Sequence, residues 1–241
     1  MERCELRYQD RLLPDQPEQS KLFSGAQGTF LDQLYNTIVT ASAIASPHEE
    51  LKLELSERFR IEEMSSSPVN LRLLQVLMAM IGAKYVLEIG AFIGVSAIYM
   101  ARALPQGGQV VTIEKYEPFW ELCRKNFELN GVADRIRLLR GDAHELVASL
   151  PLDKPFDFVL LDGNKERYAD YFGMIDPLVR PGGMIMVDDV FFHGDALNAS
   201  PSTEKGRGVR EFLNIASGRD DYMKIVLPIS NGVMLMWKQT G

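Results

Sequence analysis

Short runs of apolar residues alternate with segments of helical periodicity over the second half of the chain. The runs predict strands at residues 85–89, 110–113, 136–139, 156–161 and 184–187, and the segments predict helices at 96–104, 117–129, 143–150, 168–178 and 206–215. Strands that are apolar throughout and alternate with helices are typical of a parallel sheet covered on both faces. We therefore expect a doubly wound α/β fold.

Two further apolar runs, 223–227 and 233–237, end the chain. The Asn231-Gly232 pair between them is a hairpin signal, so these strands are expected to be antiparallel. The sequence thus predicts a Rossmann-like, seven-stranded sheet, mostly parallel with a C-terminal antiparallel hairpin.

Helical spacing also precedes the sheet, at 30–45, at 48–63 and from Pro68 to Gly82, where Ser67 is the expected cap. The first residues are rich in polar residues, Pro and Gly, and are expected to form a loosely ordered arm over 1–29. We expect a single domain at 30–241, with a helical preface at 30–82 and the sheet domain at 83–241. The preface helices favour a homodimer, although they would equally cap the site of a monomer.

The composition excludes several classes of protein. Hydrophobic residues make up 46% of the 241 residues and charged residues 24%, which excludes disorder and coiled coil. The net charge of -7 argues against a partner bound mainly through phosphates. Two cysteines, a charged N-terminus and no long apolar stretch favour a cytoplasmic protein without a membrane span.

The end of the first strand has the glycines of a nucleoside site. Gly90 and Gly94 allow a tight turn, but the residues between them, 91–93, fill the loop with side chains, which disfavours the pyrophosphate of NAD. Glu114, at the end of the second strand, is placed to bind ribose hydroxyls, and Ala143 lies where an adenine edge would be met. S-adenosylmethionine, which has no phosphate, fits this loop better. The alternative is that the glycines form plain turns and Glu114 is solvated.

Acidic residues follow two strands that we expect to be neighbours. Asp162 follows the fourth strand, and Asp188 and Asp189 follow the fifth. Adjacent strands lie about 5 Å apart, so these carboxylates can converge on one ion. Oxygen ligands suit Mg²⁺, Mn²⁺ or Ca²⁺ rather than zinc. A single aspartate at such a place would be interpreted as a loop cap.

These motifs together resemble a known family. From about residue 34 to 237, the chain is similar to class I S-adenosylmethionine-dependent, cation-dependent O-methyltransferases of the caffeoyl-CoA and catechol type. The resemblance depends on the segments 64–68, 86–96, 161–168, 181–183, 187–189 and 231–232. The Asp-x-x-Lys-x-x-Tyr segment that begins at Asp162, followed by the paired acids, is its specific part.

The resemblance implies a role for each matching residue. It assigns cofactor contacts to Met64, Ser66, Glu88, Gly90, Ser96, Glu114, Ala143 and Asp162; a metal site to Asp162, Asp188 and Asp189; catalysis to Lys165 and Asp162; and acceptor contacts to Phe192 and Lys165. Lys165 would be the base. On the residues alone, the alternatives are that Lys165 is an exposed ion-pair partner of Asp162 or Glu166, and that Phe192 is a core aromatic.

The chain departs from the family pattern at two positions. Asp189 stands where relatives usually have Asn, which adds a negative charge that would tighten metal binding and weaken the Lewis acidity of the ion. Asn164 stands where the plant branch has an acid, so a close plant-type enzyme is not expected.

The implied activity is methyl transfer from S-adenosylmethionine to a hydroxyl of a vicinal diol, catechol-like or hydroxycinnamoyl, with a divalent cation, most simply Mg²⁺. A free phenol has a pKa of about 10, and chelation of neighbouring hydroxyls would favour the phenolate. Lys165 can accept a proton only if its pKa is lowered. The alternatives are a tRNA methyltransferase acting on wobble 5-hydroxyuridine, an NAD-dependent oxidoreductase and a non-catalytic adenosyl-binding module.

Overall fold

A computed structural model describes residues 37–150 and 154–240. The chain forms two compact units, residues 1–45 and 46–241. In the first unit, the described residues begin with a helical turn, in which the Ser42 N–H donates to the Ile38 carbonyl at 3.0 Å. The predicted arm at 1–29 lies outside the described residues, and the division at 82/83 stays a prediction. The sheet and the candidate site belong to the second unit.

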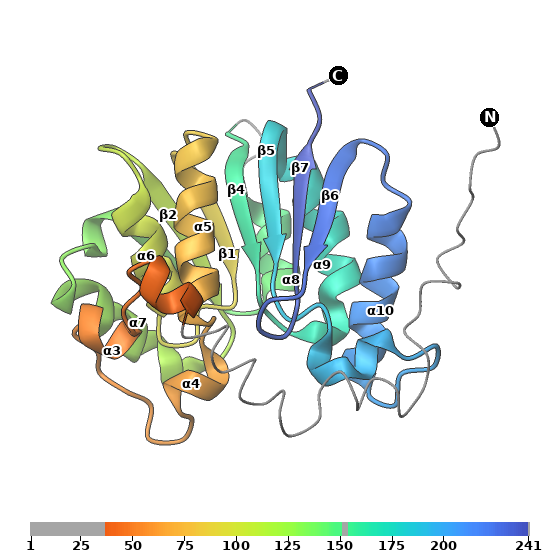
Figure 1. Cartoon of the computed structure of the whole chain (residues 1–241). Coiled ribbons are helices and arrows are strands. Elements are labelled where there is room, and N and C mark those ends of the chain that lie inside the picture. Colours follow the sequence, from red (N-terminus) through yellow and green to blue (C-terminus); the bar gives the residue numbers. More distant parts are fainter. Residues whose placement is uncertain (1–36, 151–153, 241) are drawn as a thin grey trace. The chain divides into compact units, whose positions relative to one another are not determined.

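A seven-stranded sheet has the strand order β3-β2-β1-β4-β5-β7-β6 (Figure 1). Strands β1 to β5 pair in parallel, and β7 is antiparallel to both β5 and β6, as predicted. The strands are β1 (Tyr85–Ile89), β2 (Gln109–Glu114), β3 (Ile136–Arg140), β4 (Phe156–Leu161), β5 (Val179–Val187), β6 (Tyr222–Leu227) and β7 (Val233–Lys238).

Helices cover the two faces of this sheet with two separate cores. Figure 1 shows α5 in front of the strands and α8 and α9 behind them. The front core packs Leu74 of α5 and Ile98 of α6 against the sheet, and the rear core packs Phe172 of α9 and Phe212 of α10. The helices are α3 (Pro47–Glu50), α4 (Ile61–Met64), α5 (Pro68–Met80), α6 (Val95–Ala103), α7 (Glu117–Leu129), α8 (Ala143–Leu146), α9 (Tyr168–Ile175) and α10 (Glu204–Ser217).

The predicted helix over 48–63 is wrong. Only its ends are helical, as α3 and α4, and residues 51–60 contain no helix or strand. Two asparagines of α7 bind the backbone of this segment instead: Asn126 accepts from the Glu54 N–H at 2.6 Å, and Asn130 accepts from the Lys52 N–H at 3.2 Å. The amides of both asparagines also donate to the carbonyls of those two residues. These tertiary hydrogen bonds replace those that a helix would make.

The third predicted helix is confirmed, and it leads into the site. Ser67 caps α5 by accepting the Asn70 N–H at 3.2 Å, and Gly82 follows the helix with a φ of 63°. Along the described segments, no helix is both long enough and apolar enough to span a membrane.

The predicted hairpin is present, but Asn231 is not one of the left-handed residues of its turn. The Gly232 N–H donates to the Ile229 carbonyl at 2.9 Å, and the left-handed residues are Ser230 (φ 52°) and Gly232 (φ 85°) rather than Asn231. The side chain of Asn231 is therefore available for another role.

Candidate functional site

The predicted site residues gather where the central parallel strands end. Ile89, Leu161 and Val187, the last residues of β1, β4 and β5, are in register, so Asp162 and Asp188 follow side by side. In Figure 1 the loops after these strands lie along the lower edge of the sheet. Ligands of open α/β sheets bind at this edge.

Five of the predicted residues form one network. The Lys165 Nζ lies 2.6 Å from Asp162 Oδ1 and 3.0 Å from Asp189 Oδ2. The Ser66 hydroxyl donates to Asp188 Oδ2 at 3.0 Å and lies 3.4 Å from Asp162 Oδ2. Lys165 is not an exposed ion-pair partner, because its side chain is only 13% exposed.

Asn70 belongs to the same network, and the sequence reasoning missed it. Its side-chain amide lies 3.0 and 3.1 Å from the two carboxylate oxygens of Asp188, and the residue is fully buried. The Asp189 N–H donates to Asp188 Oδ1 at 2.9 Å, and the Tyr168 hydroxyl donates to the Asp188 carbonyl at 3.0 Å. An available signal was the polar Asn70 beside Leu71 in the apolar stripe of α5.

The network carries more negative than positive charge, which perturbs its pKa values. Burial raises the pKa of Asp162 to about 7; the Lys165 charge opposes this effect, while Asp188 and Asp189 add to it. Burial and the charge of Asp189 also raise the pKa of Asp188. Burial lowers the pKa of Lys165, but the charges of Asp162 and Asp189 outweigh it and hold that pKa well above its usual value. In this arrangement Lys165 is an ammonium ion rather than a base.

The loop that begins at Asp189 has an unusual backbone. Asp189 (φ 59°), Phe192 (φ 42°) and His193 (φ 54°) all occupy the left-handed region. Asp tolerates this region, as Asn would, but a bulky residue such as Phe does so rarely. Such strain clusters at functional sites, where the surrounding contacts enforce it.

A second buried carboxylate, Glu88, lies at the same edge and is bound by hydroxyl groups. The Ser96 hydroxyl donates to Glu88 Oε1, and the Thr112 hydroxyl donates to Oε2 at 2.5 Å. Glu88 has no exposed surface, and burial raises its pKa to about 7 although these hydrogen bonds oppose the shift. The sequence predicted Ser96 at this place but not Thr112.

Gly90 and Glu114 complete the cofactor side of the predicted set. Gly90 has a φ of 102°, and a Cβ there would lie 2.4 Å from the Asp162 carbonyl oxygen, so only glycine fits. Glu114 accepts the N–H groups of Phe92 and Tyr116, each at 2.7 Å, through different carboxylate oxygens. Glu114 is therefore buried and bound, not a solvated strand end.

Three predicted residues lie outside these hydrogen-bonded groups. Met64 ends α4 and is 44% exposed, Ala143 begins α8 and is buried, and Phe192 is partly buried against the rear core. Within residues 37–150 and 154–240, no three His, Cys, Asp or Glu side chains are arranged as a ready metal-binding group. The three aspartates face Lys165 and Ser66 instead of one common point.

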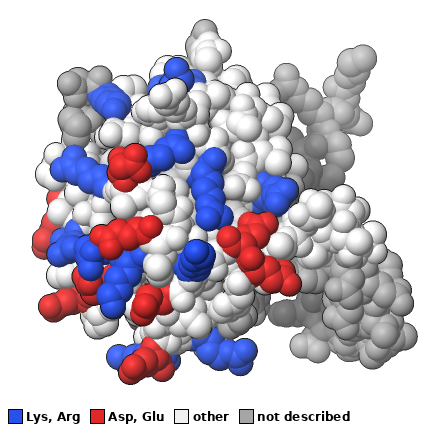
Figure 2. Space-filling view, turned by 90° about the vertical axis from the view of Figure 1, so that its left-hand side faces the viewer, with Lys and Arg blue, Asp and Glu red and all other residues white. Residues whose placement is uncertain are grey.

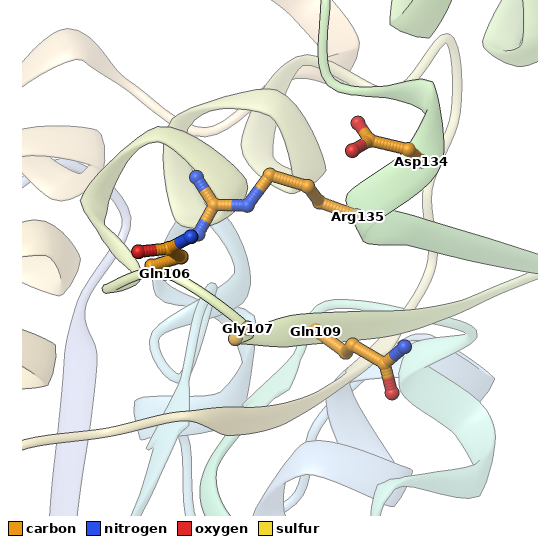
Figure 3. A pocket seen from close by; sticks show the side chains of 6 residues that line it. Gln106, Gly107, Gln109, Asp134 and Arg135 are labelled. Atoms are coloured by element: carbon orange, nitrogen blue, oxygen red, sulfur yellow. The ribbon is translucent and has the colours of Figure 1, made fainter.

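A hollow with a volume of about 440 Å³ lies elsewhere in the described part of the chain (Figure 3). It is lined by Gln109, which begins β2, and by Asp134 and Arg135, which precede β3, so it lies at the opposite end of the strands from the acidic network. The Arg135 guanidinium is occupied by two backbone carbonyls at 2.7 Å. Nothing in its lining suggests a ligand.

Comparison with known sequences gives relatives along most of the chain. The O-methyltransferase family model matches residues 40–239. Caffeoyl-CoA O-methyltransferase 2 from Zea mays is 31% identical over 216 residues, which cover 85% of this chain and 82% of the relative. A catechol O-methyltransferase from Niastella koreensis is 32% identical over 151 residues, 62% of this chain and 68% of the relative.

Solved structures agree with this assignment. An O-methyltransferase from Bacillus cereus in complex with SAH has a TM-score of 0.68 at 29% identity, covering 73% of this chain and 83% of that one. The O-methyltransferase TomG from Streptomyces achromogenes in complex with SAM has a TM-score of 0.70 at 29% identity, covering 80% and 94%. The chain therefore belongs to the O-methyltransferase family and is an S-adenosylmethionine-dependent enzyme.

Proposed function

We propose that this enzyme methylates one hydroxyl of a small aromatic vicinal diol, of catechol or hydroxycinnamoyl type, with the help of a divalent cation. The observation that carries the proposal is the network in which Lys165 pairs with Asp162 and Asp189 and the Ser66 hydroxyl joins Asp162 to Asp188. The names of the maize and Niastella relatives support the substrate class.

The donor set fits a hard dication such as Mg²⁺. Three carboxylates and one ammonium leave two formal negative charges uncompensated, and the charges of Asp188 and Asp189 add to the effect of burial in raising the pKa of Asp162. Asp162, Asp188 and Asp189 would hold the ion, with Mn²⁺ and Ca²⁺ as the other candidates. When bound, the cation favours the phenolate form of a chelated diol.

Lys165 has a conditional role in this proposal. Its Nζ is paired with Asp162 and Asp189, which holds its proton. With those carboxylates engaged by a bound cation, the Lys165 ammonium would lose the partners that raise its pKa and could release its proton to water. The neutral Nζ would then be able to accept the proton of the reacting hydroxyl. Asp162 and Lys165 would then be the catalytic pair, and Lys165 and Phe192 would contact the acceptor.

The other predicted residues would hold the methyl donor. Glu88, Gly90 and Ser96 would line its methionine end, and Glu114 its ribose. Met64, Ser66 and Ala143 would cover it, the last at the adenine, and Asp162 would border it. Orientation of the methyl group towards the oxygen nucleophile can supply about 7–11 kcal/mol of the barrier.

On the face shown in Figure 2, the surface charge favours a small acceptor over tRNA. Figure 2 shows Lys and Arg interspersed with Asp and Glu there. On α7, Arg124 is paired with Glu121 and Glu128 at 2.5 Å each, so its charge is locally balanced. A nucleic-acid surface would gather basic side chains.

We also propose that the enzyme is a cytoplasmic homodimer. Cell fractionation would test its location, and sedimentation would test its oligomeric state.

The test is a methyl-transfer assay on the purified chain. Catechol and caffeoyl thioester are compared with phenol, each with Mg²⁺ and with excess EDTA. We expect methylation of the diols alone, lost in EDTA and restored by Mg²⁺. Full turnover in EDTA would refute the cation, and methylation of hypomodified tRNA alone would refute the substrate class.

A further inference from the structure

The turn between β6 and β7, residues 228–232, contacts both sides of the candidate site. On one side the Ser230 hydroxyl lies 2.7 Å from the Ser67 hydroxyl, at the cap of α5. On the other side Asn231 and Gly232 bind the loop that follows Asp189. The turn thus joins the segment that supplies Asn70 to the segment that carries Phe192.

Three hydrogen bonds fasten this loop to the turn. The Val190 N–H donates to the Gly232 carbonyl at 3.0 Å, and the Phe191 N–H donates to the Asn231 carbonyl at 2.9 Å. The His193 N–H donates to the side-chain oxygen of Asn231 at 2.7 Å. The first two bonds need only a backbone, whereas the third requires a side chain with an acceptor at position 231.

The third bond falls where the loop backbone is least favourable. Phe192 and His193 are consecutive left-handed residues, with φ values of 42° and 54°. Such a conformation persists only when its surroundings enforce it. The turn also packs closely beneath the loop, because a Cβ at Gly232 would lie 2.6 Å from Phe191 Cγ.

We propose that Asn231 is a positioning residue for the acceptor: through the His193 N–H, it holds the Phe192 ring where the acceptor binds. This inference rests on the proposed function, both for the identity of the methyl acceptor and for its contact with Phe192. Asn231 does not touch the acidic network, whose carboxylates are bound by Ser66, Asn70 and Lys165. Loss of the Asn231 side chain should therefore weaken binding of the methyl acceptor and leave binding of S-adenosylmethionine unchanged.

The experiment compares three variants. Asn231→Leu removes the side-chain oxygen that accepts the His193 N–H while keeping a similar size, and Asn231→Asp keeps an oxygen there. Asn198→Leu, at an exposed asparagine in the same loop, is the matched control. One hydrogen bond corresponds to a roughly three- to tenfold change in an equilibrium. We expect Asn231→Leu to raise the KM for catechol by that factor with S-adenosylmethionine affinity unchanged, and Asn231→Asp to restore it.

Hydrogen exchange at the His193 amide provides a readout that needs no turnover. The amide should be protected in the wild type and in Asn231→Asp, and exchange faster in Asn231→Leu. If the wild type methylates no diol, the proposed function fails, and this exchange still decides whether Asn231 holds the loop. Unchanged KM and exchange in Asn231→Leu would overturn the inference. A joint loss of kcat, acceptor binding and donor binding that Asn231→Asp does not rescue would overturn it as well.

Discussion

Two buried acidic groups share one edge of the sheet and are stabilised in opposite ways. Glu88 is bound by the hydroxyls of Ser96 and Thr112, which carry no charge. Asp162 is bound by the ammonium of Lys165 and lies close to two more aspartates. Burial is the largest influence on both carboxyls and raises the pKa of each to about 7.

The difference shows which of the two acidic groups finds all its hydrogen-bond donors and counter-charges within the protein. Both oxygens of Glu88 have donors within the chain, so this group needs nothing further to be satisfied. In the aspartate network, one lysine is shared between two of three carboxylates. Buried like charges are costly unless a counter-charge is present, so the aspartate network is the one expected to respond to a cation.

Removing the Asp162 carboxylate, one of the two that pair with Lys165, should give the largest effect. Asp162→Asn deletes the charge that pairs with Lys165 and, in our proposal, holds the cation, so we expect kcat/KM to fall by about 10²–10³-fold. Asp134→Asn, an exposed aspartate at the opposite end of the strands, is the control. Circular dichroism should show an unchanged fold. Activity above a tenth of the wild-type value would contradict the prediction.

The next effect concerns stability at Glu88. The ordinary pKa of a glutamate is 4.5, and in the folded protein the pKa of Glu88 is about 7. The contribution of Glu88 to stability is therefore fully present below pH 4.5 and is lost as the pH rises through about 7. Glu88→Gln does not titrate. The difference in unfolding free energy, wild type minus variant, should therefore fall by about 3 kcal/mol between pH 4.5 and 8. Urea denaturation across this range measures it, and a pH-independent difference would show that Glu88 is not the titrating group.

The fold and the strand-end residues could be predicted because both depend on local patterns. Continuous apolar runs specify a covered parallel sheet, and the ends of neighbouring parallel strands coincide, which brings Asp162 next to Asp188. The segment 51–60 could not be predicted in the same way. Its backbone is bound by Asn126 and Asn130, 72 and 78 residues away.

The same limit explains why Asn70 was missed within the site and why the contact of Asn231 with the His193 N–H was not predicted. Asn70 contacts Asp188 across 118 residues, and Asn231 contacts His193 across 38. An asparagine in an apolar stripe or in a hairpin gives a local signal, but the partner of its amide depends on the assembled fold. The high pKa of Lys165 likewise depends on two carboxylates from different strand ends.

The substitution Asn70→Leu tests whether the hydrogen bonds to Asp188 stabilise the fold more than those to Glu88 do. Asn70→Leu leaves a buried carboxylate without its amide donor, which we expect to cost about 1–3 kcal/mol of unfolding free energy. Thr112→Val removes one neutral donor from Glu88 and should cost less, because its carboxyl can take up a proton near pH 7. Urea denaturation at pH 7.5 compares the two variants. An equal or smaller loss in Asn70→Leu would contradict this ranking.

The smallest effect should come from Asp189→Asn, which introduces the residue that the family resemblance leads us to expect at this position. Asn tolerates the φ of 59°, so the loop should keep its conformation. Lys165 keeps Asp162, but the network loses one of its three charges. Because the Asp189 side chain is 33% exposed, solvent screens that charge, and we expect Mg²⁺ half-saturation of activity to rise roughly fivefold or less. At saturating Mg²⁺, kcat should stay the same or increase, since the ion keeps more of its Lewis acidity. Tighter Mg²⁺ binding in this variant would mean that Asp189 serves only as a partner of Lys165 and not as a ligand.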